Sequence, residues 1–391
     1  MSLPNETLEL VATHLVSKNL LTMRLVCKDA AAKVARQIAL ESFSELHILL
    51  SIPSSLQKAI EVTKHPILRQ GVSKVVLYVD HPSENVWHDI YILENFDDSY
   101  ENPSEEVRAQ RRFHMKMYED LLEDYDNVTS TQKDQESLTI VLQNLRTSAK
   151  SFDLVVREIT PLTGPPGRRF PKDYTKLKQV YGAELNLTPH MDDAHRMLTI
   201  ALNAVADCHI RLRSLSIYSP DGNFFVPFTL LPELQSAASV IQRLQGLQHL
   251  SLTLRPEVTD VETPEESIVD ALRFIEVFAP TLTILKLVQE GDSINMEGLE
   301  ECMVSFLDGL FDTIFFAKLE ILGLWWASVH YHKLVSFLKR HTKTLKRISL
   351  EDTVTVEPDY HHVPYEHMGV EWQDFLTRDG LKLTFLEGEE Y

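Results

Sequence analysis

The feature that most constrains the fold is an apolar motif, Leu-x-x-Leu-x-Leu, which recurs along the second half of the chain. Its five copies occupy residues 212–217, 247–252, 282–287, 319–324 and 345–350, with isoleucine at some positions. Two stretches upstream, 43–48 and 72–77, keep the same spacing of apolar residues. The last two apolar positions of each copy lie two residues apart, so they share one face of a strand. The motif therefore predicts a series of similar short strands.

The intervals between the strands carry helical patterns, at 56–60, 197–205, 230–244, 268–278, 299–311 and 334–338. Two helix starts are marked by proline after a capping threonine, at Thr188-Pro189 and Thr263-Pro264. Strands that alternate with helices favour parallel strands joined by helical crossovers. The sequence thus predicts an α/β fold.

This strand–helix repeat resembles leucine-rich-repeat domains. The resemblance implies an arc with parallel strands inside and helices outside, in which each repeat buries the apolar face of its neighbour. Most intervals exceed the ~20–29 residues of a typical repeat. The asparagine or cysteine that usually follows the strand is replaced by Arg255, Glu290 and Ala327. We therefore expect an irregular arc.

The first 36 residues predict a small helical module of another kind. Proline at position 4 suits the first turn of a helix, and Leu8, Val11 and Leu15 form one apolar stripe along it. Ser17 can cap a second helix, and an alanine-rich third helix follows Lys28. A module below ~40 residues buries its own apolar residues poorly. Its leucines should face a partner or the rest of the chain.

These residues resemble an F-box, the motif that docks to the Skp adaptor of cullin-RING ubiquitin ligases. The resemblance implies a three-helix F-box over 1–40 and a leucine-rich-repeat-like domain over 41–391, a combination found in fungal F-box proteins especially. The implied adaptor-binding residues are Leu3, Pro4, Leu8, Val11, Leu15, Leu20, Leu21, Leu25 and Val26. Two positions depart from the pattern, because Val16 replaces a frequent proline and Ala30 a frequent tryptophan. An ordinary helical hairpin packed on its own domain is the alternative.

The charge of the chain is acidic and uneven. Aspartate and glutamate number 57 against 38 lysines and arginines, a net charge of −19. This balance opposes nucleic acid and anionic membrane as partners, since both attract basic surfaces. Acidic residues are concentrated in the stretch from about residue 84 to residue 136. We predict that this stretch is a solvated insertion, partly helical around residues 105–125. An acidic contact for a basic partner is the alternative.

The sequence also indicates in which cellular compartment the protein is expected. No apolar run approaches the ~18 residues of a membrane span, and the N-terminus lacks the pattern of a secretory signal. Cys27, Cys208 and Cys302 are far apart, which fits a reducing compartment without structural zinc. We expect a cytoplasmic or nuclear protein.

Catalytic motifs are absent from the sequence. It has no glycine-rich phosphate loop, no G-x-S-x-G elbow and no H-E-x-x-H helix. Histidines cluster at 330–332 and, near Asp359, at 361–367. Zinc needs convergent ligands, and Asp359 could complete such a set, but adjacent loop histidines are more often surface polar residues. We predict no metal, no cofactor and no enzymatic activity.

Strand alternation selects a candidate recognition face, opposite to the motif leucines. The candidate target-binding residues on it are Tyr218, Thr253, Lys286, Val288, Trp325 and Glu351. Trp325 is expected to be an exposed anchor of the kind that dominates interfaces, and Trp326 to point into the core. Alternatively, the C-terminal segment covers Trp325, or the strand register differs by one residue.

The two resemblances together imply the substrate-recognition subunit of an SCF-type cullin-RING ubiquitin ligase, acting in ubiquitin-dependent degradation. The F-box would bind a Skp-type adaptor, and through it a cullin, while the repeat arc would bind an unknown protein substrate. The chain would contribute proximity rather than bond chemistry. Two alternatives stay open: an F-box-type interaction or scaffold protein outside a ligase, and an α/β enzyme whose repeats imitate leucine-rich ones.

Overall fold

The computed structural model describes residues 43–79, 105–147, 151–157, 191–218, 225–255 except 229, 264–289 and 297–355, with single positions within 19–40 and 376–385. The chain divides into two compact units. Unit 1 comprises Met1–Phe152 and Val156–Asp193, and unit 2 comprises Asp153–Val155 and Ala194–Tyr391. The segment that the sequence predicted as one domain, 41–391, is thus shared between both units.

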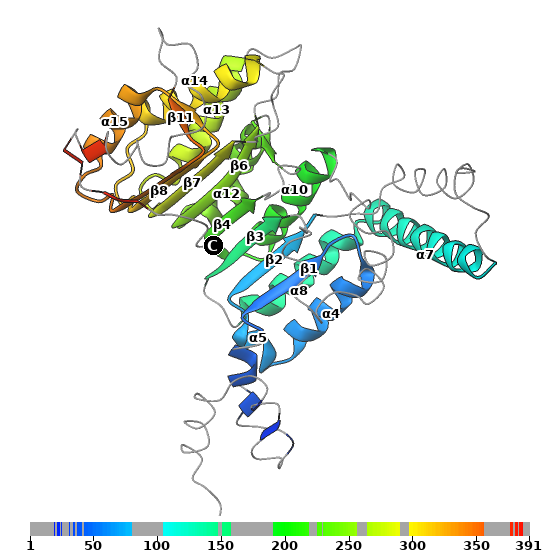
Figure 1. Ribbon diagram of the computed structural model, residues 1–391. Helices are drawn as coiled ribbons and strands as arrows, with labels where there is room; N and C mark the ends of the chain where they lie inside the picture. The colour runs from blue at the N-terminus through cyan, green and yellow to red at the C-terminus, as the bar shows by residue number, and fades with distance from the viewer. Residues whose placement is uncertain are drawn as a thin grey trace, which may run out of the picture. The chain divides into compact units, whose positions relative to one another are not determined.

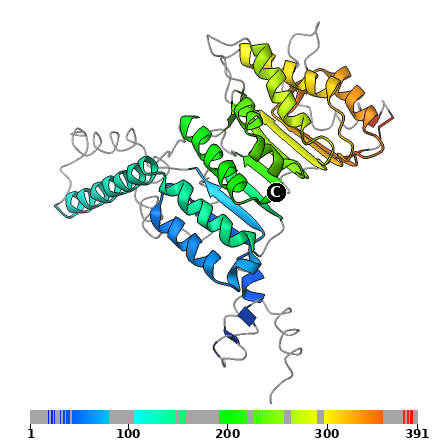
Figure 2. The ribbon, with the colours of Figure 1, turned by 180° about the vertical axis from the view of Figure 1, so that it is seen from behind.

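Unit 1 is an α/β unit. Its elements in chain order are β1 (Glu45–Leu49), α4 (Pro53–Lys64), α5 (Leu68–Gly71), β2 (Lys74–Tyr78), α7 (Glu105–Ser130), α8 (Lys133–Arg146) and β3 (Ser151–Arg157). Strands β1 and β2 are parallel, and β2 lies next to β3. Helices α4 and α8 pack against each other and cover one side of the strands (Figure 2). The two upstream motif copies are in register, with the buried pairs Leu46↔Val75 and Ile48↔Leu77.

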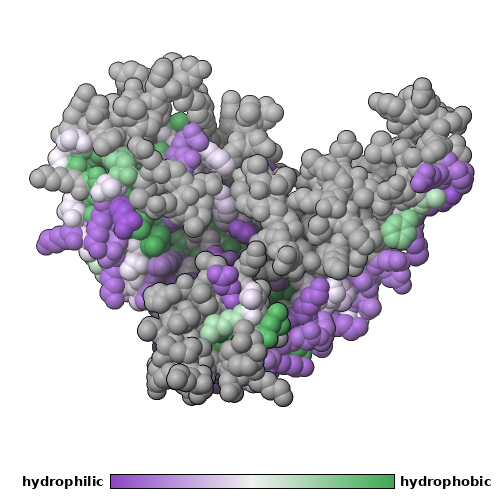
Figure 3. Space-filling model, turned by 60° about the horizontal axis from the view of Figure 1, so that its bottom comes forward, coloured by the Kyte–Doolittle hydropathy of each residue, from purple (hydrophilic) through white to green (hydrophobic). Residues whose placement is uncertain are grey.

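Helix α7 covers much of the predicted acidic insertion. The described side chains of its first half are mostly exposed, including Phe113, and its surface is mainly hydrophilic (Figure 3). In its second half Tyr118, Tyr125 and Val128 are buried, and the helix packs against α8 and α4. The expectation of a solvated insertion is therefore wrong for this half, because three widely spaced apolar residues form a stripe that the charged composition conceals. Residues 84–104 lie outside the described residues.

The segment before β1 packs closely on α5. Val34 and Ile38 are buried, with Met23 and Phe43 against them. At Gly71, the last residue of α5, an added Cβ atom would lie 2.1 Å from the carbonyl oxygen of Ala39. A contact this short with backbone requires the absence of a side chain at position 71.

Replacing Gly71 with alanine should therefore destabilise the protein by about 1–3 kcal/mol, the usual cost of overpacking, because backbone atoms must move apart. Chemical denaturation of the full chain measures the change. Gly246→Ala is the matched control, since nothing lies within 4 Å of a Cβ atom added there. Equal stability of the two variants would contradict the close approach of α5 to Ala39.

Unit 2 repeats the strand–helix pattern. Its elements are α10 (Met191–Asp207), β4 (Arg211–Tyr218), β5 (Val226–Pro227), α11 (Leu230–Ser236), α12 (Ala238–Leu244), β6 (His249–Arg255), α13 (Pro264–Glu276), β7 (Ile284–Gln289), α14 (Glu297–Thr313), β8 (Ile321–Trp325), β9 (Ser328–Val329), α15 (Tyr331–Arg340), β10 (Arg347–Glu351), β11 (Val354–Thr355) and β12 (Thr384–Phe385). The strand order is β4-β6-β7-β8-β10-β12, with β5 beside β6. From β4 to β12 neighbouring strands of this order pair in parallel, and β5 with β6 and β9 with β11 are parallel as well. The predicted α/β class is confirmed.

The five motif copies align across this sheet. Their central positions pair in the series Leu215↔Leu250↔Leu285↔Leu322↔Ile348, and all five side chains are buried. A backbone hydrogen bond links each copy to the next just before the strand, from Gln248 N–H to Arg213 O, Thr283 N–H to Gln248 O, Glu320 N–H to Thr283 O and Lys346 N–H to Glu320 O. The predicted strands are thus present, and the structure shows that they share a common register.

Helices form a layer on one side of the unit 2 strands (Figures 1 and 2), and the motif leucines are buried. Successive helices α13, α14 and α15 contact one another. Aromatic side chains fill this layer: the rings of Phe228 and Phe306 lie 5.0 Å apart, and those of Phe311 and Phe337 lie 5.1 Å apart. Helix α13 begins at Pro264, as the Thr263-Pro264 signal predicted.

A buried histidine closes the end of α15. His341 Nε2 accepts a hydrogen bond from the N–H of Phe316 at 3.0 Å, and its Nδ1 lies 2.8 Å from the carbonyl oxygen of Phe337. Both contacts together require the neutral ring with its proton on Nδ1. Burial lowers the pKa of His341, and the nearby charge of Arg340 lowers it further. The hydrogen bond to the Phe337 carbonyl acts in the opposite direction and raises the pKa.

Because the pKa of His341 is lower in the folded state than its ordinary 6.5, the unfolded chain binds more protons below about pH 6.5. The contribution of His341 to the free energy of unfolding should be complete above that pH. It should decrease as the pH falls toward the pKa that His341 has in the folded state. Urea denaturation at about pH 8 and about pH 5 measures the difference. In His341→Gln the difference should shrink, whereas in the exposed control His332→Gln it should persist. An unchanged difference in His341→Gln would contradict the assignment.

Candidate functional site

The candidate recognition residues lie on the second face of the unit 2 sheet, opposite to the motif leucines. Register places two rows across the strands. The first row is Ser216, Ser251, Lys286, Gly323 and Ser349, and the second is Thr253, Val288, Trp325 and Glu351, with Tyr218 at the end of β4. The structure therefore brings the predicted residues together on one face.

Accessibility divides these residues into two groups. Tyr218 and Lys286 are half-buried and Glu351 is exposed. Thr253, Val288 and Trp325 are buried. The prediction that Trp325 is exposed is therefore wrong, and the candidate target-binding residues Thr253 and Val288 are not accessible either. The reason is that alternation assigns a side chain to a face but does not determine what covers that face.

The two tryptophans show the reverse of the predicted exposures. Trp325 is only 6% exposed, whereas Trp326 is 39% exposed. Strand β8 ends at Trp325, and Trp326 has φ of 53°, in the left-handed region. Asp352, the equivalent residue after β10, has φ of 47°, and its carboxylate accepts a hydrogen bond from Trp326 Nε1 at 2.9 Å. Alternation stops where the strand stops, so it could not place Trp326 in the core.

Polar groups of the neighbouring strands hold the ring of Trp325. Its Nε1 donates to Ser349 Oγ at 3.0 Å, and Lys286 Nζ lies 5.1 Å from the ring centroid. Gly323 makes room for the lysine, since a Cβ atom added there would lie 3.2 Å from Lys286 Cγ. Burial lowers the pKa of Lys286. A buried indole with a satisfied N–H and a cation over its face forms a rigid support for the lysine side chain.

Charged groups occupy the start of these strands. Arg213 binds the carboxylate of Asp153 with two hydrogen bonds, of 2.9 and 2.5 Å. His249 is half-buried nearby, and burial lowers its pKa. Asp153 opposes that shift, whereas Arg213 and Lys286 add to it. A half-buried imidazole, a paired arginine and a partly desolvated lysine thus lie near one another at the start of these strands.

Unit 1 carries a polar network that the sequence analysis missed. The hydroxyl of Tyr78 contacts Arg157 Nη2 at 2.8 Å and His47 Nδ1 at 3.0 Å. Glu45 contacts His47 at 3.3 Å and Lys74 at 3.2 Å. Burial raises the pKa of Glu45, but the hydrogen bond to Lys74 and the charges of Lys74, His47 and Arg157 together lower it below its ordinary value. Strands far apart in the sequence supply these residues, so no local motif could reveal them.

The predicted adaptor-binding residues lie outside the described residues except for Leu25. The side chain of Leu25 is 85% exposed, and its N–H donates to the carbonyl of Thr22. Of the predicted histidine clusters, 361–367 also lies outside the described residues. His330 binds Asp308 at 2.8 Å, and its ring centroid is 5.8 Å from that of His332. Within the described ranges, no three histidine, cysteine or acidic side chains group as metal ligands.

Comparison with known proteins gave no match, either among protein-family models or among curated proteins. No helix in the part of the chain that the structure describes is long and apolar enough to cross a membrane.

Proposed function

We propose that this chain is the substrate-recognition subunit of a cullin-RING ubiquitin ligase of the SCF type, working in the cytoplasm or nucleus. The observation that carries the proposal is the F-box-like pattern of residues 3–28, followed by strand–helix repeats in a common parallel register. The exposed Leu25 adds support, because the later residues Val34 and Ile38 of the same segment are buried. An exposed leucine on such a small module is consistent with a surface that binds an apolar partner.

The target protein would bind the second face of unit 2. We propose Tyr218, Lys286 and Glu351 as its contact residues, since these are the accessible members of the predicted set. The buried ring of Trp325 would contribute indirectly, by keeping the Lys286 side chain in place. Aromatic and charged groups on a rigid face are typical of binding surfaces, since little conformational entropy is lost when a partner binds.

Co-purification of the full-length chain with its adaptor tests the proposal. Recovery of both a Skp-type adaptor and a cullin is the expected result. Recovery of the adaptor without a cullin would favour the second candidate, a scaffold protein outside a ligase. Recovery of neither would overturn the proposal.

A further inference from the structure

The chain segment that contains α15 is basic, in contrast to the chain as a whole. Residues 321–350 contain no aspartate or glutamate, although the whole chain has a net charge of −19. Their basic residues are Lys333, Lys339, Arg340, Lys343, Lys346 and Arg347. Lys339, Arg340, Lys343, Lys346 and Arg347 are exposed. A local positive field on an acidic protein selects for negatively charged partners.

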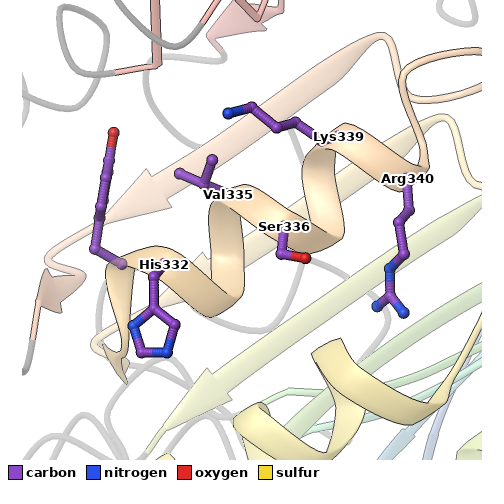
Figure 4. Close-up of a pocket in the computed structure, with 6 residues that line it drawn as sticks. His332, Val335, Ser336, Lys339 and Arg340 are labelled. Carbon is purple, nitrogen blue, oxygen red and sulfur yellow. The ribbon is translucent and has the colours of Figure 1, made fainter.

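A hollow of about 520 Å³ lies on this surface, lined by Tyr331, His332, Val335, Ser336, Lys339 and Arg340 of α15. Figure 4 shows His332 and Arg340 directed to one side of the helix and Val335 with Lys339 to the other. Val335 is buried, whereas His332, Ser336, Lys339 and Arg340 are exposed. The hollow therefore combines an apolar base with a rim of cations and one hydroxyl.

Neighbouring carboxylates neutralise only part of this charge. Lys333 pairs with Asp312, and Lys346 pairs with Glu320 at 2.8 Å. Arg340 donates instead to the backbone carbonyl of Asp312, at 3.0 Å, which leaves its positive charge uncompensated by that contact. Within the described part of the chain, Lys343 forms no ion pair. The positive charges of Arg340 and Lys343 therefore remain beside the hollow.

We propose that this hollow binds an acidic segment of another protein. Carboxylates of the segment would pair with the cationic rim, and an apolar side chain would rest on Val335 and Tyr331. A long polyanion such as nucleic acid would extend beyond the patch and meet the acidic remainder of the surface, whereas a short acidic segment would not. The proposal concerns a helical surface distinct from the second face of the sheet, and it does not depend on the F-box.

Binding of a short fluorescein-labelled peptide of glutamate and leucine, measured by fluorescence anisotropy with the full-length protein, tests the proposal. Lys339→Glu combined with Arg340→Glu should weaken binding at least about tenfold, because attraction turns into repulsion. The matched control is Lys58→Glu combined with Lys64→Glu, which makes the same change of charge at two exposed positions of α4 and should alter binding less than about twofold. Raising the ionic strength from about 0.05 to about 0.5 M should also weaken binding.

Three outcomes would overturn the proposal. Equal loss in both double variants would show that the peptide senses only the overall charge. Displacement of the peptide by an unlabelled oligonucleotide at lower concentration than by the unlabelled peptide would assign the surface to nucleic acid. The third outcome is that the protein alone forms a dimer, and that Lys339→Glu combined with Arg340→Glu converts it to a monomer. This would identify a second copy of the chain as the occupant. Thermal melting of each variant establishes that it is folded.

Discussion

Replacement of Trp325 with alanine should lower the free energy of unfolding by about 3–5 kcal/mol, the usual cost of removing a buried aromatic side chain. The ring is 6% exposed, and it also carries the hydrogen bond to Ser349 and the contact with the Lys286 ammonium group. Its removal leaves the Ser349 hydroxyl without its donor and Lys286 without its aromatic neighbour. Chemical denaturation of the full chain measures the loss.

The neighbouring residue provides the control. Trp326→Ala should cost less than about 1 kcal/mol, because the side chain is exposed and its bond to Asp352 is replaced by bonds to water. The two variants remove the same side chain at adjacent positions, so they differ only in the surroundings. A larger loss for Trp326→Ala than for Trp325→Ala would restore the arrangement expected from strand alternation.

Replacement of Leu8 and Leu15 together with aspartate should abolish adaptor binding. Leu8, Val11 and Leu15 form the stripe of the proposed F-box, and charges placed in an apolar contact lose the burial energy and must also be desolvated, at several kcal/mol in total. Co-purification of the variant chain with the adaptor measures the effect. The repeats should remain folded, which the thermal unfolding of the same chain can establish.

The matched control places the same charges on apolar residues outside the stripe. Ile140 and Val269 are exposed and lie outside the proposed F-box, so Ile140→Asp combined with Val269→Asp should leave adaptor binding intact. If Leu8→Asp with Leu15→Asp still co-purifies with the adaptor as well as this control does, the F-box proposal is wrong. Loss in both variants would mean that the added charge, rather than the stripe, prevents binding.

Local patterns in the sequence were enough to predict the strands. Leu215, Leu250 and Leu285 are aligned in adjacent strands because each repeat places its apolar pair at the same distance from the preceding turn. Parallel pairing then follows from the helical intervals, since a helical crossover returns the chain to the end of the sheet at which the previous strand began. Alternation also assigned Lys286, Ser349 and Trp325 correctly to one face.

The sequence by itself determined the α/β class, the positions of the repeated strands and the face on which their residues lie, because these depend on periodicity and on short-range geometry. Only the tertiary structure decided that Trp325 is buried and Trp326 exposed, that the second half of α7 joins the core of unit 1, and that Tyr78 and Arg157 share a polar network. The physical reason is that burial depends on which distant segments cover a face. A backbone with positive φ, as at Trp326, also ends the alternation that the local pattern extends.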